Sequence, residues 1–202
     1  MKEIINSHGW ENSFPQYNKA QILIVGTIPS DEGIKNKFYY SSKKNHMYEI
    51  LDYIFATGKQ FHNAKHAKIN NNDDKCLEDL LKKYKIMFND VYSSVDKHVN
   101  NSSDSQIING NLKEANDFYR IFDENKAMGK VICNSKLAYK EFIKIMQSAE
   151  LVKIMQQDEQ KSLLDYGNRK IKVYRAQSPS GRNYRADTKD KINQEWKKII
   201  NK

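Results

Sequence analysis

Two segments far apart in the sequence each carry a short apolar run into a turn that contains proline. The run 22–25 leads into Gly26-Thr27-Ile28-Pro29-Ser30, and the run 171–175 leads into Ala176-Gln177-Ser178-Pro179-Ser180-Gly181-Arg182. In an open parallel sheet, ligands bind where such turns leave the carboxyl ends of the strands. The second turn is rich in hydroxyl groups and basic side chains, and both kinds of group bind phosphate oxygens. We therefore interpret the two turns as facing sides of one crevice built against a phosphate backbone.

Positive charge is concentrated near the second turn. The 202 residues carry a formal net charge of +9, and residues 168–202 hold 11 Lys and Arg against three Asp and Glu. The preceding residues hold 23 basic and 22 acidic side chains. Concentrated positive charge steers polyanions to a surface, so nucleic acid is the partner that this pattern favours. A solubilising tail is the alternative that charge alone leaves open.

The cysteine and histidine positions argue against a metal site. Cys76 and Cys133 lie far apart with no Cys-x-x-Cys motif, which excludes a four-thiolate zinc or iron–sulfur site within the chain. They are expected to be packed thiols in a reducing compartment. The histidines show no metal-ligand spacing with acidic partners, so solvated loop positions are expected for His46, His62, His66 and His98.

Local patterns indicate that the chain is soluble, and they predict its strands and helices. The N-terminus lacks an apolar signal segment and no run is long enough to span a membrane, so we expect a soluble, cytoplasmic monomer with no membrane partner. Buried strands are predicted at 22–25, 86–88, 131–133 and 171–175. Apolar residues at helical spacing predict helices from 47, over 112–122, from 138 and over 192–200. Asn45 is the expected N-cap of the first helix, and Asp187 or Thr188 that of the last.

Alternating strands and helices of this kind indicate right-handed β-α-β units. We expect one α/β domain over 1–202, a three-layer α/β/α sandwich with a short, mostly parallel four-stranded central sheet. The stretch 58–74 has no periodicity and is expected to form an exposed, mobile excursion.

The two turns resemble the first and last motifs of the uracil-DNA glycosylase superfamily, a Gly-x-(Asp/Asn)-Pro turn and an x-Pro-Ser turn. The run 39–45 and the helix after it are similar to the branch that acts on deaminated purines and mismatched bases, which includes the hypoxanthine enzymes. The middle segments of that branch are also similar to this chain at Asp90-Val91, Ser103-Asp104, Asn116-Asp117-Phe118, and Asn134 followed by Ala138 and Phe142. The resemblance covers residues 20–185.

This resemblance implies a monofunctional DNA glycosylase of base-excision repair. Such an enzyme hydrolyses the N-glycosidic bond of a deaminated base, hypoxanthine or uracil, that is flipped out of DNA, and it leaves an abasic site. Water is the nucleophile, DNA is the partner, and no metal or cofactor is implied.

The resemblance also implies a set of base-binding residues. The base is expected to lie among Thr27, Ile28, Tyr39, Tyr40 and Asn134. Tyr39 or Tyr40 offers a ring on which the base can stack, and Asn134 can read the base edge. The alternatives are a buried core tyrosine and an asparagine that only serves its turn.

Asn45 and Ser180 are the expected catalytic residues. Asn45 can orient water and hydrogen-bond a base edge, although it is not a general base at neutral pH, and its alternative role is only to cap its helix. The remaining expected contacts grip the DNA strand through hydroxyls, turn amides and arginines, namely Ser178, Pro179, Gly181, Arg182, Arg175 and Arg185.

Two departures from the superfamily pattern lead to a second hypothesis. Ile28 stands where many members have an Asp or Asn that positions the hydrolytic water, and Ser178 replaces a His or Asn that assists the departing base. The alternative function is therefore a catalytically weakened module that binds modified or single-stranded DNA, in a regulatory or antiviral role. A third hypothesis is a nucleotide- or sugar-phosphate enzyme with phosphate at the turn 178–182.

Overall fold

The computed structural model describes residues 2–6, 19–30, 33, 39–40, 42, 44–56, 79–98, 113–147, 152–158 and 160–202. A six-stranded sheet with the order β3-β2-β6-β9-β8-β7 organises the described part of the chain. In chain order its strands are β2 (Ile22–Gly26), β3 (Ile86–Asp90), β6 (Lys130–Cys133), β7 (Val152–Asp158), β8 (Lys161–Tyr166) and β9 (Arg169–Arg175). The expected excursion at 58–74 and the motif at 103–104 lie outside the described residues.

The four strands predicted from the sequence form the parallel half of this sheet. β2 pairs in parallel with β3 and with β6, and β6 pairs in parallel with β9. β2 is buried on both faces, because Leu23 and Val25 pack on one side of the sheet and Ile24 on the other. The carboxyl ends of all four strands therefore lie at the same edge of the sheet.

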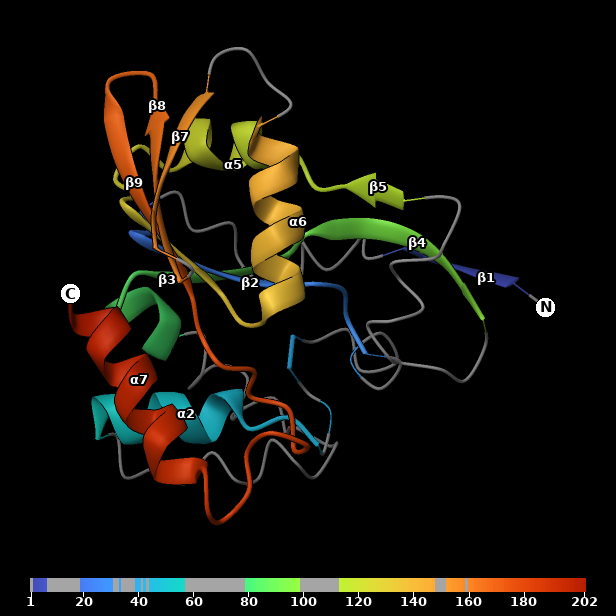
Figure 1. Ribbon diagram of the computed structural model, residues 1–202, viewed down its shortest axis with the longest axis vertical. Helices are drawn as coiled ribbons and strands as arrows, with labels where there is room; N and C mark the ends of the chain where they lie inside the picture. The colour runs from blue at the N-terminus through green and yellow to red at the C-terminus, as the bar shows by residue number, and fades with distance from the viewer. Residues whose placement is uncertain are drawn as a thin grey trace.

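Helices cover both faces of the sheet, as the layered prediction required (Figure 1). On one face lie α2 (Met47–Phe55) and α7 (Lys189–Asn201), whose apolar residues share a buried cluster with Ile24, Ile132 and Tyr174. On the other face lie α5 (Phe118–Glu124) and α6 (Lys136–Gln147), which pack on Leu23, Val131 and Val173. A mixed α/β fold with a central sheet is confirmed.

The prediction of only four strands is wrong, because a hairpin extends the sheet beyond β9. β8 pairs antiparallel with β9, and β7 pairs antiparallel with β8 at the edge. Gly167, at φ 56°, lies in the turn between β8 and β9. A two-residue Gly167-Asn168 turn between alternating runs is a hairpin signal that the sequence contained.

A second sheet was also not predicted. Its strands are β1 (Lys2–Asn6), β4 (Tyr92–His98) and β5 (Lys113–Ala115), in the order β1-β4-β5, and it extends away from the main sheet in Figure 1. The helix predicted over 112–122 is shorter than expected, since β5 occupies its first part. α5 begins only at Phe118. Its N-cap residue is Asp117, whose side chain accepts a hydrogen bond of 3.0 Å from the amide of Arg120.

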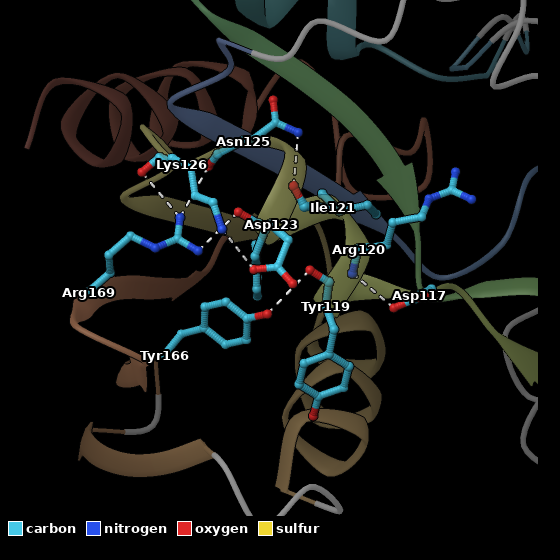
Figure 2. Close-up of polar contacts among 10 residues, drawn as sticks. Asp117, Tyr119, Arg120, Ile121, Asp123, Asn125, Lys126, Tyr166 and Arg169 are labelled. Carbon is cyan, nitrogen blue, oxygen red and sulfur yellow. Dashed lines mark hydrogen bonds and ion pairs between the residues drawn. The ribbon is translucent and has the colours of Figure 1, made fainter.

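The hairpin is anchored to α5 through Arg169 (Figure 2). The guanidinium group donates hydrogen bonds of 2.9–3.2 Å to the carbonyls of Phe122, Asn125 and Lys126, at the C-terminal end of α5. Tyr166 supports the same junction, because its hydroxyl donates to the carbonyl of Tyr119 and its ring lies 5.1 Å from the guanidinium carbon. A cation at this end of a helix satisfies carbonyls that have no partner within the helix.

Candidate active site

Several residues expected to line the crevice lie at the carboxyl ends of the parallel strands. Gly26 at the end of β2 is paired in register with Asp90 at the end of β3, and Cys133 at the end of β6 with Arg175 at the end of β9. Asn134 follows β6 directly, and its amide donates to the carbonyl of Val25, 2.9 Å away. The residues that follow these strands are thereby brought to one edge.

The second turn pairs with the segment just before α2. Asn45 and Ser180 form an isolated antiparallel bridge. The amide of His46 donates to the carbonyl of Pro179, 2.8 Å away, and the amide of Gly181 donates to the carbonyl of Lys44. The segment 44–46 and the turn 178–181 are therefore one paired unit, although 135 residues separate Asn45 from Ser180 in the chain.

Asn45 is not the N-cap residue that was predicted for α2, since His46 occupies that position, but it directly precedes the N-cap. Its side-chain oxygen accepts a hydrogen bond of 2.9 Å from the amide of Met47, the first residue of α2. Its own amide donates to the carbonyl of Ser42 at 2.9 Å. These contacts hold the side chain in one orientation, with the Nδ2 group as its hydrogen-bond donor.

The two tyrosines differ in their surroundings. Tyr39 is 8% exposed, and its ring belongs to the core, 6.2 Å from the ring of Phe88. This packing supports the core interpretation that the sequence left open for Tyr39. Tyr40 adopts a left-handed backbone conformation at φ 58°, and its ring meets Phe88 edge-on at 5.0 Å. Left-handed backbone is uncommon for a bulky residue and is frequent at binding sites.

The hydroxyl of Tyr40 lies among polar groups of the crevice. It accepts a hydrogen bond of 3.1 Å from Nδ2 of Asn134, whose residue is 8% exposed. A Cβ on Gly26 would lie 3.3 Å from this hydroxyl and would collide with Oδ1 of Asp90. The pKa of Tyr40 is raised well above its usual value, first by burial and then by the charge of Asp90. The crevice therefore contains a buried carboxylate that approaches the glycine of the first motif.

The first motif contributes one polar and one apolar side chain. Thr27 is 5% exposed, and its hydroxyl lies 3.5 Å from the hydroxyl of Ser135, which accepts a hydrogen bond from an amide in the first turn of α6. Ile28 is partly buried and packs against the core cluster beneath α5 and α6. No polar group is available from the side chain at position 28, whereas Asp90 supplies a carboxylate from the neighbouring strand.

The second turn is held from both sides. Before the turn, the amide of Gln177 donates to Glu195 at 3.0 Å, and Nε1 of Trp196 donates to the carbonyl of Gln177 at 2.9 Å. After it, the hydroxyl of Tyr184 donates to Asn193 at 3.0 Å. α7 therefore fastens both ends of the turn, while the segment before α2 pairs with its middle.

The turn amides do not point at a ligand as expected. The amide of Ser180 donates to Oγ of Ser178 at 3.3 Å, and that of Gly181 donates to Lys44. These N–H groups are used to hold the turn, which corrects the expectation that they bind phosphate. The hydroxyls of Ser178 and Ser180 belong to partly exposed residues and remain able to donate.

The three expected arginines occupy different environments. Arg182 and Arg185 are exposed, and Nε of Arg185 donates to the carbonyl of Arg182 at 2.8 Å. Arg175 is partly buried, and its charge lowers the pKa of Glu195. Burial is the larger effect on Glu195, so its pKa is raised overall. Arg182 and Arg185 thus lie on the exposed rim, while Arg175 interacts with α7.

His46 is not the solvated loop residue that the sequence predicted. Its Nδ1 lies 3.0 Å from Oε1 of Glu49, and the imidazole stacks on Tyr184 with 4.5 Å between ring centroids and an angle of 22°. The side chains of His46 and Glu49 are 15% and 8% exposed. The spacing of a histidine and a glutamate three residues later was the signal that could have identified this pair.

Cys133 is the packed thiol that was expected: it is fully buried, and burial raises its pKa well above the ordinary value. Within the described ranges, no three His, Cys, Asp or Glu side chains gather as they would around a metal ion. The helices found there include none that is long and apolar enough to cross a bilayer.

Comparison with known proteins identifies a structural likeness. No family model matches the chain, and no curated protein matches it. Among solved structures, it is similar to the solution structure of a putative uracil DNA glycosylase from Methanosarcina acetivorans. The TM-score is 0.59 at 19% sequence identity, and the match covers 91% of this chain and 90% of that chain. This likeness is one of fold.

Proposed function

We propose that this protein is a DNA glycosylase that hydrolyses the N-glycosidic bond of a deaminated base, hypoxanthine or uracil, and leaves an abasic site. The observation that carries the proposal is the bridge between Asn45 and Ser180, which joins the segment before α2 to the second turn. The described structural neighbour bears the name of a uracil DNA glycosylase, and its fold extends over most of both chains.

The crevice offers groups suited to an extruded base. A base in a duplex cannot be attacked at its sugar, so the nucleotide must leave the stack and enter a pocket. Tyr40 and Thr27 would border that pocket. Asn134 now donates to the Tyr40 hydroxyl, and it would exchange this contact for one with the base edge. Each exchange of this kind replaces one hydrogen bond by another at little net cost.

The reaction needs water held near the sugar and a stabilised cationic transition state. The oxygen of water bonds to the anomeric carbon while the bond to the base nitrogen breaks, and the base leaves with the electron pair. Asn45 would orient this water through its side-chain amide. Asp90 would supply the carboxylate that Ile28 does not, since it is 2% exposed and lies at the Gly26 end of the crevice. The DNA phosphates would stabilise the developing positive charge.

The turn 178–181 would hold the DNA strand beside this site. The hydroxyls of Ser178 and Ser180 are donors for phosphate oxygens. Arg182 and Arg185 lie on the exposed rim, where they would neutralise flanking phosphates and make binding depend on salt.

The test is release of free base from oligonucleotides that contain one deoxyinosine or one deoxyuridine, each as a single and as a double strand. Alkali cleaves the strand at an abasic site, so product length reports base release. We expect cleavage with at least one of the two bases. No release from any of the four substrates would remove the proposed activity on hypoxanthine and uracil.

A second candidate function is binding of modified or single-stranded DNA without chemistry. The packing of Ile28 against the core favours it, because this position supplies neither a carboxylate nor an amide. DNA binding with a steep salt dependence, together with no base release, would support this candidate over the enzyme.

A further inference from the structure

The helices on the two faces of the six-stranded sheet do not extend equally far. On the α5/α6 face, the buried cluster reaches the added strands, because Leu164 of β8 belongs to it and Ile154 of β7 packs against it. On the α2/α7 face, the cluster contains Tyr174 of β9 but no described residue of β7 or β8. Figure 1 shows β7, β8 and β9 rising above α7, which lies near the bottom of the view. Part of this sheet face is therefore left without a helix.

The strand register shows which side chains lie on the uncovered face. Tyr174 points to the α2/α7 side, and so does Lys172, two residues earlier in β9. Residues directly opposite each other on neighbouring antiparallel strands share a face. Lys172 is opposite Leu163, and Leu163 is opposite Met155. These three side chains form one row across β9, β8 and β7.

Lysines flank this row on both sides. In the next row, Lys170 is opposite Asp165, which is opposite Lys153. Asp165 also pairs with Lys170, with 3.1 Å between Oδ1 and Nζ. On the other side, Lys161 is opposite Tyr174, and its Nζ lies 5.9 Å from the centroid of that ring.

The uncovered face is therefore basic around an apolar centre. Its lysines outnumber its acidic residues, even with Asp158 included, which is opposite Lys161 beyond a bulge at the end of β7. We call the apolar and basic residues of these rows the lysine face, namely Lys153, Met155, Lys161, Leu163, Lys170 and Lys172.

The centre of the lysine face is accessible. Met155 is 38% exposed, and within the described part of the chain Tyr53 is the only other large hydrophobic residue that is exposed to this extent. Leu163 beside it is partly exposed. An apolar centre within a polar rim is the anatomy of a protein–protein interface, and methionine is common in such surfaces because its side chain adapts to its partner.

The chemistry of these rows favours an acidic protein over nucleic acid. Single strands bind to sheets by stacking bases on accessible rings, and Tyr174, the aromatic residue of these rows, is only 5% exposed. Duplex DNA would place phosphates against Met155 and Leu163, where they would meet apolar side chains.

A second copy of this chain is also a poor occupant. It would bring the same lysines against each other, and like charges repel. The outer strand β7 has a lysine at Lys153 and a bulge between Gln156 and Asp158, two features that oppose pairing of exposed edge strands.

We propose that the lysine face binds an acidic amphipathic helix of a partner protein. The helix lies beside α7, in the layer that stops at β9, and so completes the cover of this sheet face. Its apolar side contacts Met155 and Leu163, and its Asp and Glu side chains pair with the surrounding lysines. This inference goes beyond the proposed function and does not depend on it.

Two dye-labelled synthetic peptides of identical composition, rich in leucine and glutamate, are the probes. In the first, leucines at helical spacing form one stripe between glutamates, and in the second the order is scrambled so that a helix has no stripe. Fluorescence anisotropy measures their binding. We expect the wild type to bind the striped peptide at least about tenfold more tightly, because only the stripe can cover Met155 and Leu163 together.

Variants assign the binding to this face. Lys153→Glu/Lys172→Glu should weaken binding of the striped peptide by at least about tenfold, since it places carboxylates opposite carboxylates. Lys140→Glu/Lys144→Glu is the matched control, because these exposed lysines lie on α6 at the other face and the change in net charge is the same. It should stay within about twofold of the wild type. Met155→Ser should reduce the preference for the striped peptide.

Several outcomes would overturn the inference. One is a wild type that binds neither peptide or does not distinguish them, and another is equal weakening by the two double variants. A third is an undamaged oligonucleotide whose binding is weakened by the lysine-face variant and not by the control, which would assign this face to DNA. Thermal unfolding shows whether each variant is folded, and Lys153→Gln/Lys172→Gln replaces the charge reversal if that variant is unstable.

The proposed function is tested separately with the same preparations. We expect Lys153→Glu/Lys172→Glu to release base like the wild type, since the crevice lies at the carboxyl end of β9 and not on its lysine face. Absence of base release from the wild type would remove the glycosylase proposal and leave the peptide result standing.

Discussion

At the scale of single residues, Asn45 combines a structural contact with a proposed chemical one. Its side-chain oxygen accepts from the amide of Met47, the first residue of α2, while its backbone is bridged to Ser180 at the second turn. The two roles use different atoms of one carboxamide. Substitutions that keep the oxygen acceptor but remove the nitrogen can therefore separate them.

We expect Asn45→Ala and Asn45→Ser to differ in stability but not in activity. Alanine removes the oxygen that accepts from the amide of Met47 and should lower the free energy of unfolding by about 1 kcal/mol, whereas serine keeps a hydroxyl oxygen that can accept this hydrogen bond. Both lack the amide, so both should lose base release while they keep most DNA affinity. Urea unfolding, base release and DNA binding are measured on the same preparations. Wild-type turnover by Asn45→Ser would show that the amide is not needed.

At the scale of elements, the junction of β2 and β3 places two residues of the crevice against each other. Gly26 and Asp90 are partners in the parallel register. The absence of a side chain at position 26 makes room for the Asp90 carboxylate, which is almost completely buried. Glycine is therefore needed at this position of the first motif because a side chain there would collide with Asp90 on the neighbouring strand β3.

Gly26→Ala should therefore displace the Asp90 carboxylate and lower the free energy of unfolding by about 1–3 kcal/mol, as overpacking does in a dense core. Base release should fall with it. Gly129→Ala is the matched control, because no atom would lie within 4 Å of its Cβ, and it should change stability by less than about 0.5 kcal/mol. Chemical denaturation measures both. Equal effects of the two substitutions would contradict this account of the glycine.

The junction between the β8–β9 hairpin and α5 depends on one side chain. Arg169→Ala leaves two partly buried carbonyls and one exposed carbonyl without this donor, and each hydrogen bond from a charged group contributes about 1.5–3 kcal/mol. We expect a net loss of at least about 2 kcal/mol in the free energy of unfolding. Lys170→Ala removes only an exposed ion pair with Asp165 and should cost about 0–1 kcal/mol. Urea unfolding measures both variants. A Lys170 variant as unstable as the Arg169 variant would contradict the role assigned to Arg169.

At the scale of the whole molecule, the site joins parts of the chain that are distant in sequence. The first motif, the start of α2 and the end of β6 come from the first two thirds of the chain, while the second turn comes from its end. α7 holds the second turn through Gln177 and Tyr184. Packing of α7 on the sheet is therefore a condition for a formed site.

Buried tyrosines should make the folded protein sensitive to alkali. Burial raises the pKa of Tyr184 to about 12 and that of Tyr40 well above its usual value. In the unfolded chain both ionise near pH 10, so above that pH the unfolded state loses protons that the folded state keeps. The free energy of unfolding is then constant below about pH 10 and falls as pH rises toward 12.

Urea unfolding at a series of alkaline pH values measures this fall, and ultraviolet absorbance measures tyrosine ionisation. We expect Tyr184→Phe to lose part of the pH dependence, since it removes one of the groups responsible. An absorbance titration in which every tyrosine of the folded protein ionises near pH 10 would contradict the prediction.

Local patterns in the sequence determined the parallel half of the fold. The strand predicted at 22–25 was found as β2, the helix predicted from 47 was found as α2, and Thr188 is the N-cap of α7. These predictions succeeded because periodicity and capping depend on neighbours within a few residues. β7 and β8 were missed because β7 is largely exposed and both strands mix charged with apolar residues, and only the Gly167-Asn168 turn between β8 and β9 indicated the added hairpin.

Only the tertiary structure decided how the polar groups at the two turns are used. It brought Asn45 to Ser180, put the Asp90 carboxylate beside Gly26, and clasped His46 between Glu49 and Tyr184. It also engaged the turn amides that the sequence had assigned to phosphate. Apart from the His46–Glu49 contact and the hydrogen bond between Ser178 and Ser180, these contacts join residues tens to more than a hundred positions apart, and no local pattern indicates which of those groups will meet once the core has packed.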